Sequence, residues 1–129
     1  MSVPTSSLDQ RERTFMARMQ DVVLEGSFAT DGSDTPPRPD RYEIAAVEKA
    51  GDNLWRFHAH LVHEGMDATL PIVVPMQWIG DTPVIMLTDY SIPSLGTFTA
   101  RVLFYGDRYA GTWQHGDGLG GQLWGTIRR

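Results

Sequence analysis

The chain has 129 residues, a formal net charge of −5 and no cysteine. Without cysteine it has no disulfide bond, thiolate nucleophile or cysteine-ligated metal centre. The negative charge disfavours binding to nucleic acid, and the sequence has neither a signal-peptide pattern nor an apolar run long enough to cross a membrane. We therefore expect a cytoplasmic protein, one domain over residues 1–129, that binds neither nucleic acid nor membranes.

The first predicted element is an amphipathic helix over residues 8–19. Ser7 and Gln10 have the spacing of a capping box, and the apolar residues that follow recur at helical spacing. A helix with one apolar side must pack that side against another element. We expect this helix to cover an open end or an outer seam of a β-sheet, as fixed packing and not as a moving lid.

From Asp21 to the end of the chain, apolar and polar residues alternate, which predicts consecutive antiparallel hairpins. Residues 31–40 lack the alternation and are rich in Asp and Pro, so they are expected to form a long exposed loop. The predicted strands are one that starts near Asp21 and seven others at 42–48, 54–63, 68–78, 84–90, 98–105, 108–115 and 122–127.

About eight strands in an antiparallel meander are typical of a closed up-and-down barrel. The predicted fold class is therefore mainly β, an up-and-down barrel with one N-terminal helix. Pro71 and Pro75 complicate one strand, because proline cannot donate a ladder hydrogen bond. We expect that strand to be bulged, split or at an edge, and a β-sandwich or jelly roll is the alternative fold.

His58 and His60 are the sharpest candidates for chemistry. They are two residues apart on a predicted strand, so both imidazoles project from one face, as two ligands of one metal ion would. Trp55, Phe57 and Ala59 form the apolar face of the same strand, which places the histidines on the side that faces water. We therefore expect no metal, no cofactor and no catalytic residues, with a metal-dependent enzyme kept as an alternative.

The His-x-His pattern followed by Glu64 resembles the first metal-binding motif of the cupins, a family of jelly-roll barrels. The resemblance implies His58, His60 and Glu64 as metal ligands. It also implies a further histidine from a later strand, for which His115 is the available match.

The interior of an eight-stranded barrel is near the size at which it can hold one small ligand. Small residues on the apolar faces of the predicted strands, such as Gly26 and Gly125, would leave that interior incompletely filled. We therefore predict non-catalytic binding of a small apolar or amphipathic molecule. The candidate ligand-binding residues are Trp55, Phe57, Ala59, Phe98, Ala100, Tyr109 and Trp113. The alternative is a protein-interaction module or homodimer that uses the helix or a sheet edge.

The segment GTW at residues 111–113 resembles the Gly-x-Trp motif of the calycins, which include lipocalins, fatty-acid-binding proteins and avidin-like barrels. This resemblance implies a ligand-binding barrel. The stretch from about Asp40 to the end, above all residues 80–116, is also similar to a group of uncharacterised bacterial proteins. That second resemblance implies a bacterial domain and carries no activity with it.

Overall fold

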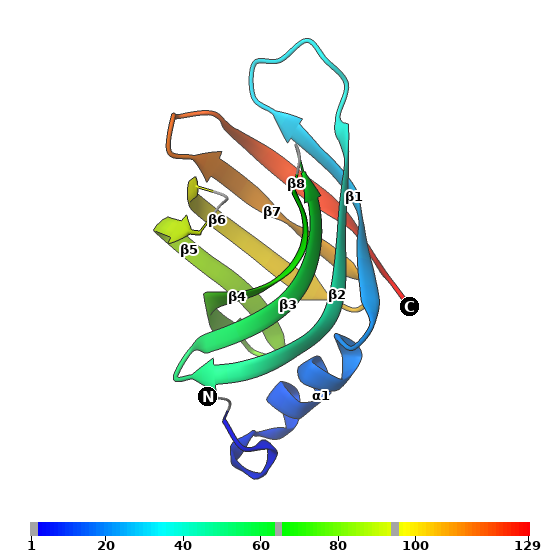
Figure 1. Cartoon of the computed structure of the whole chain (residues 1–129), viewed down its shortest axis with the longest axis vertical. Helices are drawn as coiled ribbons and strands as arrows, with labels where there is room; N and C mark the ends of the chain where they lie inside the picture. The colour runs from blue at the N-terminus through cyan, green and yellow to red at the C-terminus, as the bar shows by residue number, and fades with distance from the viewer. Residues whose placement is uncertain (1–2, 64–65, 94–95) are drawn as a thin grey trace.

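The computed structural model describes residues 3–63, 66–93 and 96–129. Eight antiparallel strands follow one another around a closed barrel, and the last pairs with the first (Figure 1). The predicted fold class is confirmed. Because every strand neighbours the next one in sequence, the chain adopts neither the sandwich nor the jelly roll considered as alternatives.

The elements in chain order are η1 (Thr5–Ser7), α1 (Gln10–Arg18), β1 (Val22–Thr30), β2 (Arg38–Gly51), β3 (Leu54–His63), β4 (Met66–Ile79), β5 (Thr82–Ile92), β6 (Gly96–Tyr105), β7 (Arg108–His115) and β8 (Gly120–Arg128). Each predicted strand overlaps an observed one. The largest difference is at β2, which starts at Arg38 and so takes in the last residues of the predicted 31–40 loop. In the part of the chain that the structure describes, no helix is both long and apolar enough to cross a membrane.

The helix begins two residues later than predicted, with Asp9 as its N-cap. The Glu12 N–H donates to Asp9 Oδ1 at 2.9 Å, and the Asp9 N–H donates to Glu12 Oε1 at 3.0 Å. The predicted Ser7–Gln10 capping box is therefore wrong, because the same pattern two residues on satisfies both free amides. Glu12 Oε2 also lies 2.6 Å from Lys49 Nζ, a largely buried ion pair that ties α1 to β2.

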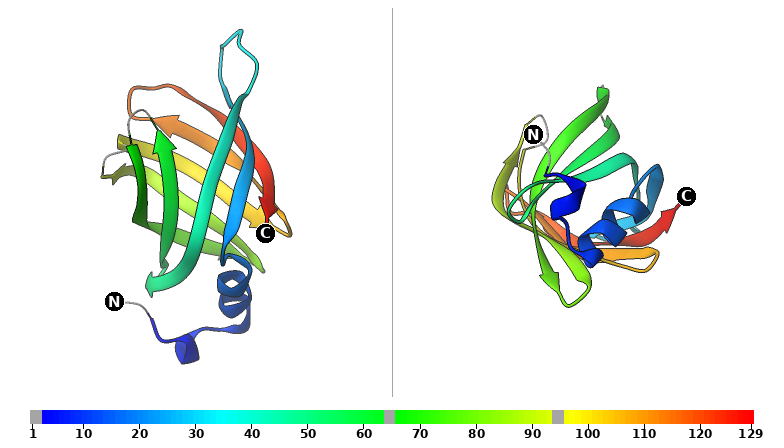
Figure 2. Two further views of the ribbon diagram at one scale, coloured as in Figure 1. Left: turned by 45° about the vertical axis from the view of Figure 1, so that its right-hand side comes forward. Right: turned by 90° about the horizontal axis from the view of Figure 1, so that it is seen from below.

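The helix closes one end of the barrel through Phe15. The helix crosses the opening when the molecule is viewed from below, and the β1–β2 loop lies at the far end (Figure 2). The Phe15 ring contacts four other rings, with centroid distances of 5.7 Å to Trp55, 6.5 Å to Phe57, 6.0 Å to Trp78 and 5.6 Å to Phe104. The expectation that the helix covers an open end is confirmed.

Strand β3 shows how the period-two pattern places side chains. Trp55, Phe57 and Ala59 are buried inside the barrel, whereas the intervening His58 and His60 are half-buried on the outer face. This is the arrangement that the sequence predicts, because successive strand residues point to opposite faces.

The seam between β4 and β5 is the least paired part of the described barrel. The two strands are in register over four residue pairs, from Met76–Ile85 to Ile79–Thr82. Beyond them, the Tyr90 hydroxyl donates to the Val73 carbonyl across the seam at 2.6 Å. Strand β4 is thus neither split nor bulged against β3, with which its register is continuous.

The two prolines of β4 suit this seam. The Met76 N–H points to the β3 side, where it donates to the Asn53 carbonyl. Since successive residues of a strand turn their amides to opposite sides, Pro71 and Pro75 direct their nitrogens toward β5. In the described chain, β5 is not paired with Pro71 or Pro75, so the N–H groups that these prolines lack are not needed there.

The glycines of β1, β7 and β8 reflect close approach of neighbouring strands. A Cβ added to Gly26 or Gly111 would overlap a backbone carbonyl of the adjacent strand, and at Gly125 it would overlap both backbone and the Tyr109 ring. These glycines are thus needed for the curvature of the wall. Their small size alone is not a sign of an unfilled interior, contrary to the argument from sequence.

We predict that Phe15→Ala destabilises the protein by about 3 to 5 kcal/mol, because it removes the ring on which four aromatic side chains pack. Phe15→Leu should cost less, since it keeps most of the buried volume. Urea unfolding monitored by tryptophan fluorescence measures both. A cost below about 1 kcal/mol for the alanine variant, the range of ordinary surface substitutions, would contradict the role given to Phe15.

Candidate functional site

The inner face of the barrel differs between its two ends. Near α1 most of the inward side chains, such as Trp55 and Phe104, are buried, whereas Trp78 is partly exposed. Toward the opposite end, inward-facing Phe28, Phe98 and Trp113 are each partly exposed. Solvent therefore reaches the inner face at the end away from the helix, and we call this end the mouth.

A polar group interrupts this apolar inner face. Asp40 and Tyr109 are only 7% and 1% exposed, and the Tyr42 hydroxyl donates a hydrogen bond to the Asp40 carboxylate. Among the described residues, Asp40 Oδ2 and the Tyr109 hydroxyl have no hydrogen-bond partner, and neither does Trp113 Nε1 nearer the mouth. We call Asp40, Tyr42 and Tyr109 the polar cluster.

The strand register brings the polar cluster together. Asp40 on β2 is opposite Gly26 on β1, Gly26 is opposite Gly125 on β8, and Gly125 is opposite Tyr109 on β7. The two intervening positions carry no side chain, and the Tyr109 ring lies over Gly125, where an added Cβ would fall 2.7 Å from Tyr109 Cε1. The tyrosine thus extends along the wall toward Asp40.

Asp40 also lies close to the mouth along β2. The paired register of β2 with β3 ends at Glu43 and His60, so Asp40 is beyond the last paired position. Arg38, two residues earlier on β2, is exposed. Asp40 therefore lies on the mouth side of the wall, whereas Tyr109 is opposite Phe104, one of the rings that pack on Phe15. The polar cluster thus extends from the mouth side toward the helix end.

Burial sets the electrostatics of the cluster. It raises the pKa of Asp40, and the Tyr42 hydrogen bond opposes this shift in part. Burial, followed by the nearby Asp40 charge, also raises the pKa of Tyr42 and of Tyr109. Both tyrosines are therefore neutral hydroxyl groups, and the cluster holds one carboxyl in an environment that disfavours its charge.

The residues predicted to bind a ligand divide between the two ends. All seven face inward: Trp55, Phe57, Ala59, Phe98, Ala100, Tyr109 and Trp113. Trp55 and Phe57 belong to the aromatic group around Phe15, Tyr109 is in the polar cluster, and Phe98 and Trp113 lie toward the mouth. Their role in binding stays a prediction.

Sequence reasoning missed Asp40 and Tyr42. The sequence pattern predicts Asp40 in an exposed loop, but it is buried in β2. The reason is the alternation Asp40, Tyr42, Ile44, which continues the inward face of β2 back past its predicted start. A charged residue is unusual at an inward strand position and therefore resembles a loop residue in the sequence. The period-two spacing nevertheless indicates that the strand includes Asp40.

The histidines predicted as alternative metal ligands lie apart. His58 and His60 are on the outer face of β3, whereas His115 packs its ring against Phe98 at the mouth, with a centroid distance of 5.1 Å. Glu64 lies outside the described residues. Within the described ranges, no three His, Asp or Glu side chains are placed to hold a metal ion.

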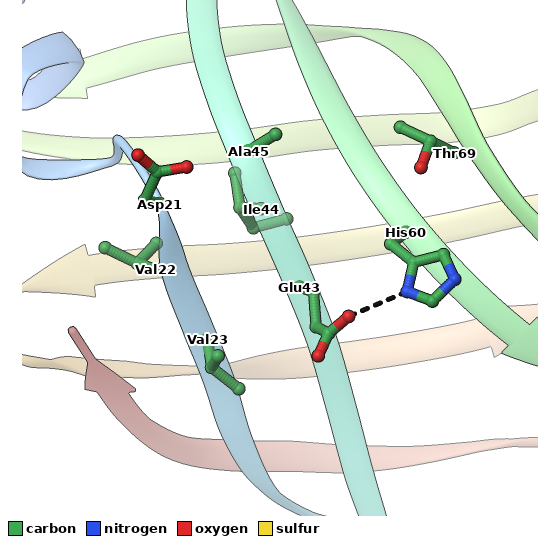
Figure 3. Close-up of a pocket in the computed structure, with 8 residues that line it drawn as sticks. All are labelled: Asp21, Val22, Val23, Glu43, Ile44, Ala45, His60 and Thr69. Atoms are coloured by element: carbon green, nitrogen blue, oxygen red, sulfur yellow. Dashed lines mark hydrogen bonds and ion pairs between the residues drawn. The ribbon is translucent and has the colours of Figure 1, made fainter.

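Both outer histidines bond to carboxylates instead. His58 Nε2 lies 2.9 Å from Glu48 Oε1, and the two nitrogens of His60 lie 2.7 Å from Glu43 and 2.6 Å from Asp67. The hydrogen bonds to Asp67 and then Glu43 raise the pKa of His60. Figure 3 shows His60 and Glu43 among the residues that line a groove of about 480 Å³, which extends from β1 across β2 and β3 to β4.

A second groove, of about 600 Å³, runs beside α1 and is lined by Phe15, Trp78 and Phe104 among others. Its cations already have partners. Arg11 lies over the Trp78 ring at 5.0 Å, and Arg18 and Arg129 share Asp107 at 3.4 and 3.0 Å. The arginines of this groove are therefore less available to a ligand than the unpartnered polar atoms of the polar cluster.

No protein-family model matches the sequence, and neither a curated protein nor a solved structure shows significant similarity to it. The eight-stranded antiparallel barrel with one helix is consistent with a calycin-like fold. Membership of a bacterial group stays a prediction.

We predict that Asp40→Asn stabilises the protein relative to the natural chain increasingly as pH rises. Because the folded state raises the pKa of Asp40, it binds more protons than the unfolded state, and the stability of the natural chain falls as pH rises from the ordinary aspartate pKa through the raised one. The difference should reach on the order of 1 to 3 kcal/mol above that window. Urea unfolding of both proteins across a pH series measures it.

Glu43→Gln provides a control of opposite sign. The pKa of Glu43 is lowered by His60 and then Arg41, so this carboxylate contributes stability that is lost as pH falls. If the Asp40→Asn difference did not change with pH, or changed in the direction expected for Glu43, the burial of a destabilised carboxyl would be contradicted.

Proposed function

We propose that the protein binds a small amphipathic molecule inside its barrel, through the mouth, without catalysis. The observation that carries this proposal is the set of buried polar atoms without partners on an otherwise apolar inner face: Asp40 Oδ2, the Tyr109 hydroxyl and Trp113 Nε1. Each such atom lowers the free energy of unfolding of a protein by about 1 to 3 kcal/mol. A bound molecule with a polar group would remove part of that cost.

The apolar part of the molecule has a surface to cover. Phe28, Phe98 and Trp113 face inward near the mouth and stay partly exposed. Covering about 100 Å² of such surface contributes about 2.5 kcal/mol. An apolar tail that covers these side chains and a polar head at the polar cluster would together use both features of the inner face.

The entrance follows from the asymmetry of the barrel. Phe15 and the four rings around it close the helix end. The mouth is opposite, and the β4–β5 seam runs toward it with the Tyr90 to Val73 hydrogen bond as its bridge. The seam would allow the wall beside the mouth to widen at the loss of few backbone hydrogen bonds.

We expect the neutral dye Nile red and decanol to bind the protein, and Ala100→Phe to abolish the binding. Ala100 faces inward between Leu87 and Trp113, so a phenyl ring there would fill the space. A ligand at about a hundred times its dissociation constant should add about 2.7 kcal/mol of stability. Dye fluorescence and thermal unfolding measure the two effects.

Leu103→Phe is the matched control, since Leu103 is on the same strand but points outward and is exposed. It should bind like the natural chain. Overpacking at Ala100 costs stability of its own, about 1 to 3 kcal/mol, so circular dichroism must show that the variant is folded at the assay temperature. Equal binding by both variants would place the ligand outside the barrel and contradict the proposal.

A further inference from the structure

Asp40 is buried and, in the described chain, has no cation beside it, in contrast to several surface carboxylates. Asp9, Glu43 and Asp107 each pair with an arginine. Among the described residues, Asp40 makes no ion pair, and its one hydrogen bond comes from the neutral Tyr42. Arg38 on the same strand is exposed, and Arg41 points outward to Glu25 and Glu43.

The groups around Oδ2 define what would satisfy it. Oδ2 accepts hydrogen bonds when the carboxyl is ionised, and the Tyr109 hydroxyl can accept one more. Tyr42 and Tyr109 add two aromatic rings, whose faces attract cations. In the described chain, the strands that carry the cluster have two basic residues at inward positions: Arg38, which is exposed at the mouth, and Lys49, which pairs with Glu12 at the helix end.

Three common head groups can be compared on this chemistry. A carboxylate would place a second negative charge beside Asp40. An alcohol would donate one hydrogen bond and leave the charge of Asp40 without a counter-ion. A protonated amine would donate to Oδ2 and to the Tyr109 oxygen, and would also neutralise the buried charge.

From this geometry we infer that the ligand is a cationic amphiphile, with a protonated amine bound by Asp40 and Tyr109 and an apolar tail directed to the mouth. The inference rests on the proposed function, because it names the ligand class of the same interior site. Asp40 supplies the charge, and Tyr42 orients the carboxylate through its hydrogen bond. The absence of side chains at Gly26 and Gly125 lets the Tyr109 ring lie along the wall toward Asp40.

The test compares three probes of one tail length, decylamine, decanol and decanoate, below the concentrations at which they form micelles. Calorimetric titration of the full chain at pH 7 should show decylamine binding at least about tenfold more tightly than decanol, the effect of roughly one additional charge-assisted hydrogen bond. Decanoate should bind most weakly. Asp40→Asn should remove the preference for the amine, so that decylamine no longer binds more tightly than decanol.

Glu43→Gln is the matched control, because Glu43 is on the same strand and points outward. It should keep the preference for decylamine. A measurement on the natural chain covers the case in which Asp40→Asn fails to fold. Lowering the pH until Asp40 is protonated should weaken the binding of decylamine, which stays charged, more than the binding of decanol.

The outcomes separate the two proposals. If decanol and decylamine bind equally, or decanoate binds best, the cationic ligand class is wrong and the interior site stands. A preference for decylamine that survives in Asp40→Asn would also overturn the assignment to Asp40. If none of the three probes binds, both the ligand class and the proposed function fail.

Discussion

The packing of Phe15 against the rings at one end of the barrel is the interaction on which the rest of the structure depends. It packs the apolar side of α1 across that end of the barrel, beside the groove that Trp78 and Phe104 line. The Glu12–Lys49 ion pair holds the helix in the same place from the side of β2. Because the helix covers this end, inward side chains are more exposed at the opposite end, although Trp78 beside the helix is also partly exposed. The two ends of the barrel therefore differ.

The polar cluster lowers the stability of the fold, because it places polar groups in an otherwise apolar interior. A buried carboxyl with one free oxygen destabilises a protein, and an apolar residue at position 40 would pack without that penalty. The surrounding wall nevertheless brings Tyr109 toward Asp40, since Gly125 has no side chain where the Tyr109 ring lies. Destabilising groups held by well-packed surroundings are characteristic of binding sites.

The weak seam between β4 and β5 lowers stability in a different way from the polar cluster, since it has few backbone hydrogen bonds and, among the described residues, buries no unpaired polar side chain. Pro71 and Pro75 limit the hydrogen bonds that β4 can donate toward β5, and one tyrosine side chain bridges the strands where the ladder ends. Few backbone hydrogen bonds would have to break for this part of the wall to move. The rigid helix end and the looser seam beside the mouth thus divide the barrel into a supporting part and a part that can adapt.

The sequence by itself determined the meander of eight strands, the helix and the inward face of β3, because period-two alternation and turn residues are local signals. It also placed Ala100, Tyr109 and Trp113 inward. It did not show that Asp40 is buried, since its short-range context of proline and aspartate is that of a loop. Only the tertiary structure decided that Asp40 and Tyr109, 69 positions apart in the printed sequence, share one wall. The physical reason is that closure of the barrel, through the pairing of β1 with β8, is a long-range contact that no local pattern specifies.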